Sequence, residues 1–235
     1  MGISGKTHLR GANLIGAKLQ GADFQEADLV KTNLEGADLR GANLKKADLR
    51  GANLSDTHLL EGKGANLQEA NLQEANLQGA SLVKTNLEKA NLERANLQLA
   101  NLHLANLKGA NLKRANFQVA NLEGAYLQGT NLEGAYLQGT NLEEADLYGA
   151  GLQEANLQEA NLRGANLYGA DLHKAYLLRA NLEGAKLEGA NLTRVHDLSI
   201  DQASKVKTLY NAKLDEEILI PLKEKYPALF RGPEE

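Results

Sequence analysis

The residues best suited to acid–base or metal chemistry are five histidines and thirty carboxylates. Catalysis or metal binding needs such groups at short, defined spacings or in recognisable motifs. The chain has no cysteine, which excludes disulfides and thiolate sites, and it contains no nucleophile elbow or dinucleotide fingerprint. We therefore predict no enzyme, no cofactor and no metal site. The histidines are widely separated, at His8, His58, His103, His173 and His196.

Most of these residues lie within a sequence repeat that is five residues long. Each unit has a small residue, then usually Asn or Asp, then Leu and two variable residues, as in ANLQEANLQEANLQG at 65–79. The central residue recurs every five positions from Leu9 to Leu59 and from Leu67 to Leu192, with Phe24 and Phe117 as replacements. A fixed internal period of this kind decides the whole fold.

A period of five excludes a helix and a straight strand. At about 100° per residue, successive leucines of a helix would lie about 140° apart and form no stripe. In a straight strand an odd period reverses the face at every unit. A short strand followed by a bend buries both the small residue and the Leu. Glycines such as Gly11, Gly16, Gly109, Gly124 and Gly164 suit the bend, because glycine adopts positive φ at low cost.

The number of sides in each coil is indicated by a weaker pattern. Gln follows the central residue at a lag of twenty, whereas a lag of fifteen gives no agreement. A lag of twenty predicts coils of four sides, stacked at about 4.8 Å through backbone hydrogen bonds. The pattern is carried by Gln78, Gln98, Gln118, Gln138 and Gln158.

These A(N/D)LXX units in tandem resemble the pentapeptide-repeat proteins over residues 7 to about 194, and the tail resembles the ends of several cyanobacterial members. The resemblance implies an all-β fold: a right-handed quadrilateral, four-sided parallel β-helix solenoid with a short α-helical C-terminal cap. We expect a lead-in over 1–6, the solenoid over 7–194 with a bulge at 60–64, and the cap over 195–235. The bulge is interpreted either as a binding loop or as a tolerated insertion.

The tail should cover the last coil, because a terminal repeat exposes its core. The sequence predicts one helix from Ser199 to about Tyr210 and another after Asp215 as N-cap, with Pro221 kinking or dividing it. The first coil has no evident cover and presents an open edge. A homodimer through an end of the rod is therefore a further prediction. The apolar residues for the cap, or alternatively for dimerisation, are Ile218, Leu219, Leu222, Leu229 and Phe230.

One side of the four is almost free of charge, with only Glu159 and Arg179 charged along six coils. An exposed apolar patch bordered by amides and aromatics is a candidate partner-binding face. The other interpretation is a ladder of Gln side chains that stack on one another. Tyr148 and Tyr168 should stack on another side. The face consists of Gln78, Gln98, Leu99, Gln118, Val119, Tyr136, Gln138, Gln158, Tyr176 and Leu178, with Leu104 near a shared edge.

The family resemblance implies one known activity, which is binding of DNA gyrase by imitation of duplex DNA. Duplex DNA carries about one negative charge per 1.7 Å, whereas the whole chain has a net charge of −4, half of it in the tail. We therefore predict a non-catalytic scaffold that binds a protein partner along one flat side, without direct binding to nucleic acid or membrane. A DNA-mimicking binder of gyrase or another topoisomerase is the alternative. The absence of a signal peptide or long apolar run favours the cytoplasm.

Overall fold

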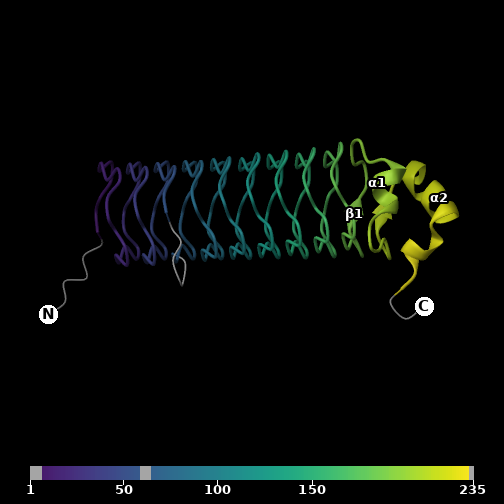
Figure 1. The fold of residues 1–235 in the computed structure, drawn as a ribbon, viewed down its shortest axis with the longest axis horizontal. Coiled ribbons are helices and arrows are strands. Elements are labelled where there is room, and N and C mark those ends of the chain that lie inside the picture. Colours follow the sequence, from purple (N-terminus) through teal and green to yellow (C-terminus); the bar gives the residue numbers. More distant parts are fainter. Residues whose placement is uncertain (1–6, 59–64, 233–235) are drawn as a thin grey trace.

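A computed structural model describes residues 7–58 and 65–232 as a rod of stacked coils (Figure 1). Four parallel bridges join the first coil to the second, from His8, Asn13, Lys18 and Asp23, and each partner lies twenty residues later. The lag of twenty is therefore confirmed, whereas the quadrilateral shape of the coil stays a prediction. The predicted bulge lies outside the described residues, and across it the lag rises to 23, as in Asn43 paired with Asn66. The right-handed sense of the coil stays a prediction.

The Asn of each unit holds both the corner and the stack. In one representative unit the Asn96 Oδ1 accepts from the backbone N–H of Gln98 at 3.2 Å, which stabilises the turn. The Asn96 Nδ2 donates to the Asn76 Oδ1 of the preceding coil at 3.1 Å. The last residue of the unit then adopts positive φ, as Gly109 does at 64°. The Asn of the motif is thus explained by two hydrogen bonds that the period alone did not reveal.

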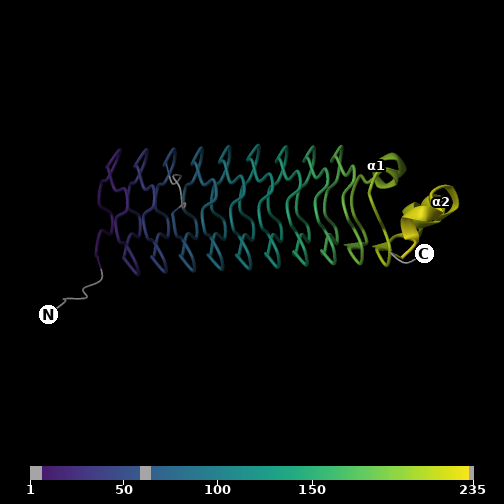
Figure 2. The same ribbon diagram turned by 60° about the horizontal axis from the view of Figure 1, so that its bottom comes forward.

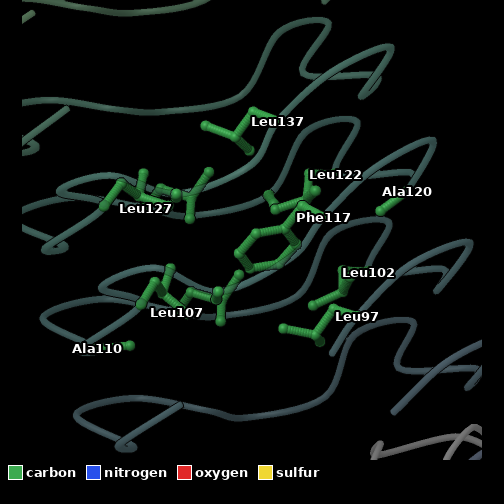
Figure 3. Close-up of a cluster of buried hydrophobic side chains, with 14 of the residues drawn as sticks. Leu97, Leu102, Leu107, Ala110, Phe117, Ala120, Leu122, Leu127 and Leu137 are labelled. Carbon is green, nitrogen blue, oxygen red and sulfur yellow. The ribbon is translucent and has the colours of Figure 1, made fainter. Parts of the chain in front are cut away.

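The core is a continuous column of Leu and Ala that runs along the rod. From Leu29 to Leu192 the described central residues are at most 2 % exposed. Phe117 fills the same position as Leu and lies among leucines of its own and neighbouring coils (Figure 3). Such burial stabilises the fold by roughly 1.5–3 kcal/mol per side chain.

Buried threonines replace alanine on the inner wall, and their hydroxyls were expected to find backbone carbonyls. Thr130 and Thr140 donate to the carbonyls of Leu127 and Phe117, at 2.8 and 2.7 Å. Thr32 and Thr57 likewise donate to backbone carbonyls. The expectation was wrong for Thr85, whose buried Oγ1 has no partner among the described residues.

The tail combines helices with a resumed repeat. Its elements are β1 (Asn191–Leu192), α1 (Ile200–Ser204), β2 (Lys213–Leu214), α2 (Glu216–Lys225) and the 3₁₀ helix η1 (Pro227–Phe230). β1 and β2 pair in parallel. A capping box from Ser199 starts α1 as predicted, but the extension of this helix to Tyr210 was wrong. Thr208 instead pairs with Lys186, because the chain returns to the side that it left.

Helix α2 begins after Asp215, so the predicted N-cap position is confirmed. Asp215 makes no side-chain cap bond, and its Oδ2 accepts from the backbone N–H of Arg194 at 2.6 Å. Pro221 lies inside α2 and does not divide it. The two helices lie at one end of the rod (Figure 2). Leu222 is fully buried there, Leu219 is half-buried, and Ile218, Leu229 and Phe230 pack against the core.

The opposite end of the rod has a less complete core. Leu9, Leu14 and Leu19 of the first described coil are only partly buried. The backbone N–H groups of Asn13 and Lys18, whose equivalents in later coils donate to the preceding coil, have no backbone partner in the part of the chain described. The homodimer through an end of the rod stays a prediction.

Candidate binding surface

Ten of the eleven predicted partner-binding residues lie on one side of the rod, which we call the Gln side. Its bridges run through Asn76, Asn96, Asn116, Tyr136 and Asn156 to Tyr176, so the residues that follow each centre form one column. That column contains the five predicted glutamines and ends at Leu178. The structure therefore brings the set together, except for Leu104, which lies at the end of the next side.

Leu99 and Val119 form the apolar centre of the Gln side. They occupy the same corner in successive coils, and they are 55 % and 60 % exposed. Their φ values are 60° and 57°, in the left-handed region that costs about 1–2 kcal/mol for a residue with a Cβ. Most corners in the rod use glycine or a charged residue. These two positions thus carry apolar side chains that neither burial nor backbone preference explains.

Leu104 has different surroundings. It is half-buried, and its side chain leans over Gly124 in the next coil. A Cβ added to Gly124 would lie 2.8 Å from the Leu104 Cδ2, so the glycine leaves the space that this side chain occupies. Leu104 therefore has an intramolecular packing role that the exposed Leu99 and Val119 lack.

The glutamines do not form a hydrogen-bonded ladder. Among the described residues no bond joins two Gln side chains of this column; the glutamines bond through their backbone groups, with the N–H of Gln78, Gln98, Gln118 and Gln158 donating to the Asn two residues earlier and the carbonyls accepting from the preceding coil. The buried Oε1 of Gln138 has no partner. The Gln side therefore presents amide groups that remain available for hydrogen bonds to another molecule.

Aromatic residues border the Gln side at its later coils. Tyr136 and Tyr176 replace Asn and are 49 % and 39 % exposed. The Tyr176 ring stacks on His196, with centroids 4.4 Å apart. Exposed tyrosines beside apolar and amide groups are typical of protein interfaces, since the ring offers apolar area and a polar hydroxyl.

Charged residues are paired along the other sides. Lys113 contacts Glu133 at 3.0 Å and Lys174 contacts Glu154 at 3.7 Å, each pair spanning two coils. On the Gln side Arg179 and Glu159 pair at its corner, two coils beyond Val119. In the four coils that contain Gln78, Gln98, Gln118 and Gln138, the two residues that follow each centre of the Gln side are uncharged.

Ionisable groups show no metal-binding arrangement in the described residues 7–58 and 65–232, where no three possible metal ligands come together. His173 Nδ1 lies 2.9 Å from the Thr193 Oγ1, a polar contact between coils. Hydrogen bonds from Arg40 hold the pKa of Asp38 well below its usual value, and Arg50 does the same for Asp48. No helix in the described residues is long and apolar enough to span a membrane.

Comparison with known proteins agrees with this geometry. The family model "Pentapeptide repeats" matches in eight copies that extend, with short gaps, from residue 5 to residue 194. The chain belongs to the pentapeptide repeat family. No curated protein matches its sequence.

Several solved pentapeptide repeat structures are similar. HetL from the cyanobacterium Nostoc sp. strain PCC 7120, a pentapeptide repeat protein involved in heterocyst differentiation regulation, is 37 % identical. The match covers 81 % of this chain and 87 % of HetL, with a TM-score of 0.57. The protein alr5209 of Nostoc is 32 % identical over 47 % of this chain and 84 % of its own, with a TM-score of 0.36. QnrB1, a plasmid-mediated fluoroquinolone resistance protein, is 20 % identical over 96 % and 99 %, with a TM-score of 0.35.

Proposed function

We propose that this protein is a non-catalytic scaffold that binds a protein partner along the Gln side. The observation that carries the proposal is the pair Leu99 and Val119. Both are exposed, both occupy left-handed corners that disfavour them, and they lie in successive coils beside amides without side-chain partners. Large apolar groups surrounded by neutral polar groups are typical of the centre of a protein interface.

The rigidity of the rod supports the same proposal. Backbone hydrogen bonds join successive coils along the described part of the rod, so the Gln side needs little ordering when it binds. HetL, which matches most of this chain, is a pentapeptide repeat protein involved in heterocyst differentiation regulation, and a regulatory binding role for this chain is compatible with the exposed apolar and amide groups of the Gln side. The cytoplasmic location predicted from the sequence is part of this proposal.

The test replaces both apolar corner residues by glycine, in the double variant Leu99→Gly/Val119→Gly. Glycine is the commonest corner residue and tolerates φ near 60°, so the fold should be retained. Proteins captured by the purified rod from its native extract should be lost with this variant. The matched control is Glu154→Gly/Lys174→Gly, which removes two corner residues with φ of 58° and 59° on another side and leaves the net charge unchanged.

Equal capture by the Leu99→Gly/Val119→Gly variant and the original chain would contradict the proposal. The DNA-mimic alternative is separated by a gyrase supercoiling assay with the same proteins. Inhibition at micromolar protein that survives in the double variant would favour binding to gyrase over binding through the Gln side.

A further inference from the structure

A cavity of about 280 Å³ lies where the rod meets the cap, away from the Gln side. It is bounded by the side of the rod that carries Tyr148 and Tyr168, by the segment after α1, and by η1 with the residue that follows it. Three separate parts of the chain therefore line one cavity, near the end of the rod that carries α1 and α2 (Figure 1). The residues that line it include Tyr168, Lys186, Glu188, Lys207, Ala228 and Arg231.

Three cations from separate parts of the chain, Lys186, Lys207 and Arg231, line this cavity, and none of them takes part in an ion pair within the described residues. Glu188 is the single acid in the lining. The cavity therefore carries an excess of two positive charges in a chain whose net charge is negative.

The aromatic ring of Tyr168 lines the cavity, and one of its two faces is covered by another ring. Its ring stacks on Tyr148 of the preceding coil, with centroids 5.2 Å apart and planes 6° from parallel, as predicted from the sequence. The next coil has Glu188 in place of a third ring, and both Tyr168 and Glu188 line the cavity. A planar ring placed there would extend the stack, an arrangement that aromatic groups favour.

The repeat itself is interrupted at this point. On this side Asn166 donates through Nδ2 to the Asp146 Oδ1 of the preceding coil at 2.9 Å, as Asn96 does to Asn76. The next position is Lys186 instead of Asn, and the chain then leaves the regular coil through α1 before Thr208 resumes the pairing. An unpaired lysine thus replaces a residue that would have made two hydrogen bonds within the ladder.

We propose that this cavity binds a phosphate group carried on a planar heteroaromatic ring, the chemistry of a nucleoside monophosphate. The base stacks on the free face of Tyr168, the phosphate is held by Lys186, Lys207 and Arg231, and Glu188 accepts a hydrogen bond from an amino or hydroxyl group. The volume lies near the lower limit of small-molecule sites, roughly 300–1,000 Å³, which favours a mononucleotide over a dinucleotide. Exposed cations are screened by salt, so binding should weaken as ionic strength rises.

Isothermal titration of the full chain with adenosine monophosphate tests the proposal, with adenosine and inorganic phosphate as separate probes. We expect a dissociation constant between about 10 µM and 1 mM for the nucleotide and binding at least tenfold weaker for each probe alone. Lys186→Asn and Tyr168→Gln should each weaken nucleotide binding at least fivefold. Asn occupies the position of Lys186 in the preceding coil, at Asn166, and Gln occupies the position of Tyr168 two coils earlier, at Gln128, so both variants should fold.

Lys45→Gln is the matched control, since it removes one positive charge from the same side several coils away and should leave binding unchanged. Three results would overturn the proposal: no heat of binding up to about 1 mM nucleotide, inorganic phosphate binding as tightly as the nucleotide, or unchanged nucleotide binding in both site variants. The result is independent of the Gln side, because none of these substitutions touches it.

Discussion

The two ends of the rod place the same repeat in different surroundings. In the first described coil Leu9, Leu14 and Leu19 remain partly exposed. In the last regular coil Leu182, Leu187 and Leu192 are at most 2 % exposed, because the tail packs over them. Both ends contain similar five-residue units, so the difference comes from the segment that covers the coil and not from the unit itself.

This comparison shows that a coil buries its central leucines fully only when another segment covers it on both sides. At the capped end the tail also replaces the missing backbone donors. In regular coils a backbone N–H of the next coil donates to each wall carbonyl, as Asn181 does to Ala160. After the last such coil the side chain of Gln202 takes this role, and its Nε2 donates to the carbonyls of Leu177 and Ala180 at 2.8 and 2.9 Å.

The largest expected effect concerns the core, compared between the middle and the open end. Leu127→Ala should destabilise the protein by about 2–5 kcal/mol, because neighbouring coils leave the cavity little room to collapse. Leu14→Ala in the first coil should cost about 1–2 kcal/mol, because part of that side chain is already in water. Urea denaturation measures both. Equal costs would mean that the open end is covered in solution.

A smaller effect is expected for the cap. Gln202→Ala removes both bonds to the last coil and the capping box of α1, so it should cost about 1–3 kcal/mol. Hydrogen exchange should show faster opening near Leu177 and Ala180, with little change in the middle of the rod. Gln78→Ala is the control, since that side chain is exposed and has no hydrogen bond among the described residues. Uniform loss of protection along the rod would contradict a local role.

The smallest effect concerns acid stability in the earlier coils. The Arg40 guanidinium lowers the pKa of Asp38, so the folded state favours the carboxylate. The stabilisation is complete above the unfolded Asp pKa of about 3.9 and is lost as the pH falls below it. Asp38→Asn, which retains an oxygen for the turn, should therefore lose less stability than the original chain between pH 7 and pH 3. Equal losses in urea titrations at the two pH values would argue against this pairing.

The sequence alone predicted the regular coils of the rod. It did not predict how the repeat resumes after α1. The period of five, the lag of twenty and the pair Tyr148 and Tyr168 depend on local spacing, which a single sequence displays. The resumption of the repeat after α1 was missed, although Leu209 and Leu214 are five apart and Ala212 precedes the second by two.

The candidate surfaces were predictable to different degrees. The Gln side depends on register alone, so the sequence placed its ten residues together, and Leu104 lies on the next side. The positive φ of Leu99 and Val119, which makes them costly, required the backbone. The cavity at the cap could not be predicted, because Lys186, Lys207 and Arg231 belong to parts of the chain whose relative positions depend on how α1 and α2 pack.

A coil of twenty residues made of four equal units has a consequence for how such a chain can lengthen. Duplication of twenty residues adds one coil and leaves every downstream side chain on its original side of the rod. Duplication of five residues turns every later unit by a quarter, and the ten-residue sequence shared by 121–130 and 131–140 corresponds to half a turn. Small duplications can therefore move outward side chains to other sides of the rod, while Leu and Ala stay in the core. New surfaces can arise in this way without any change in the core.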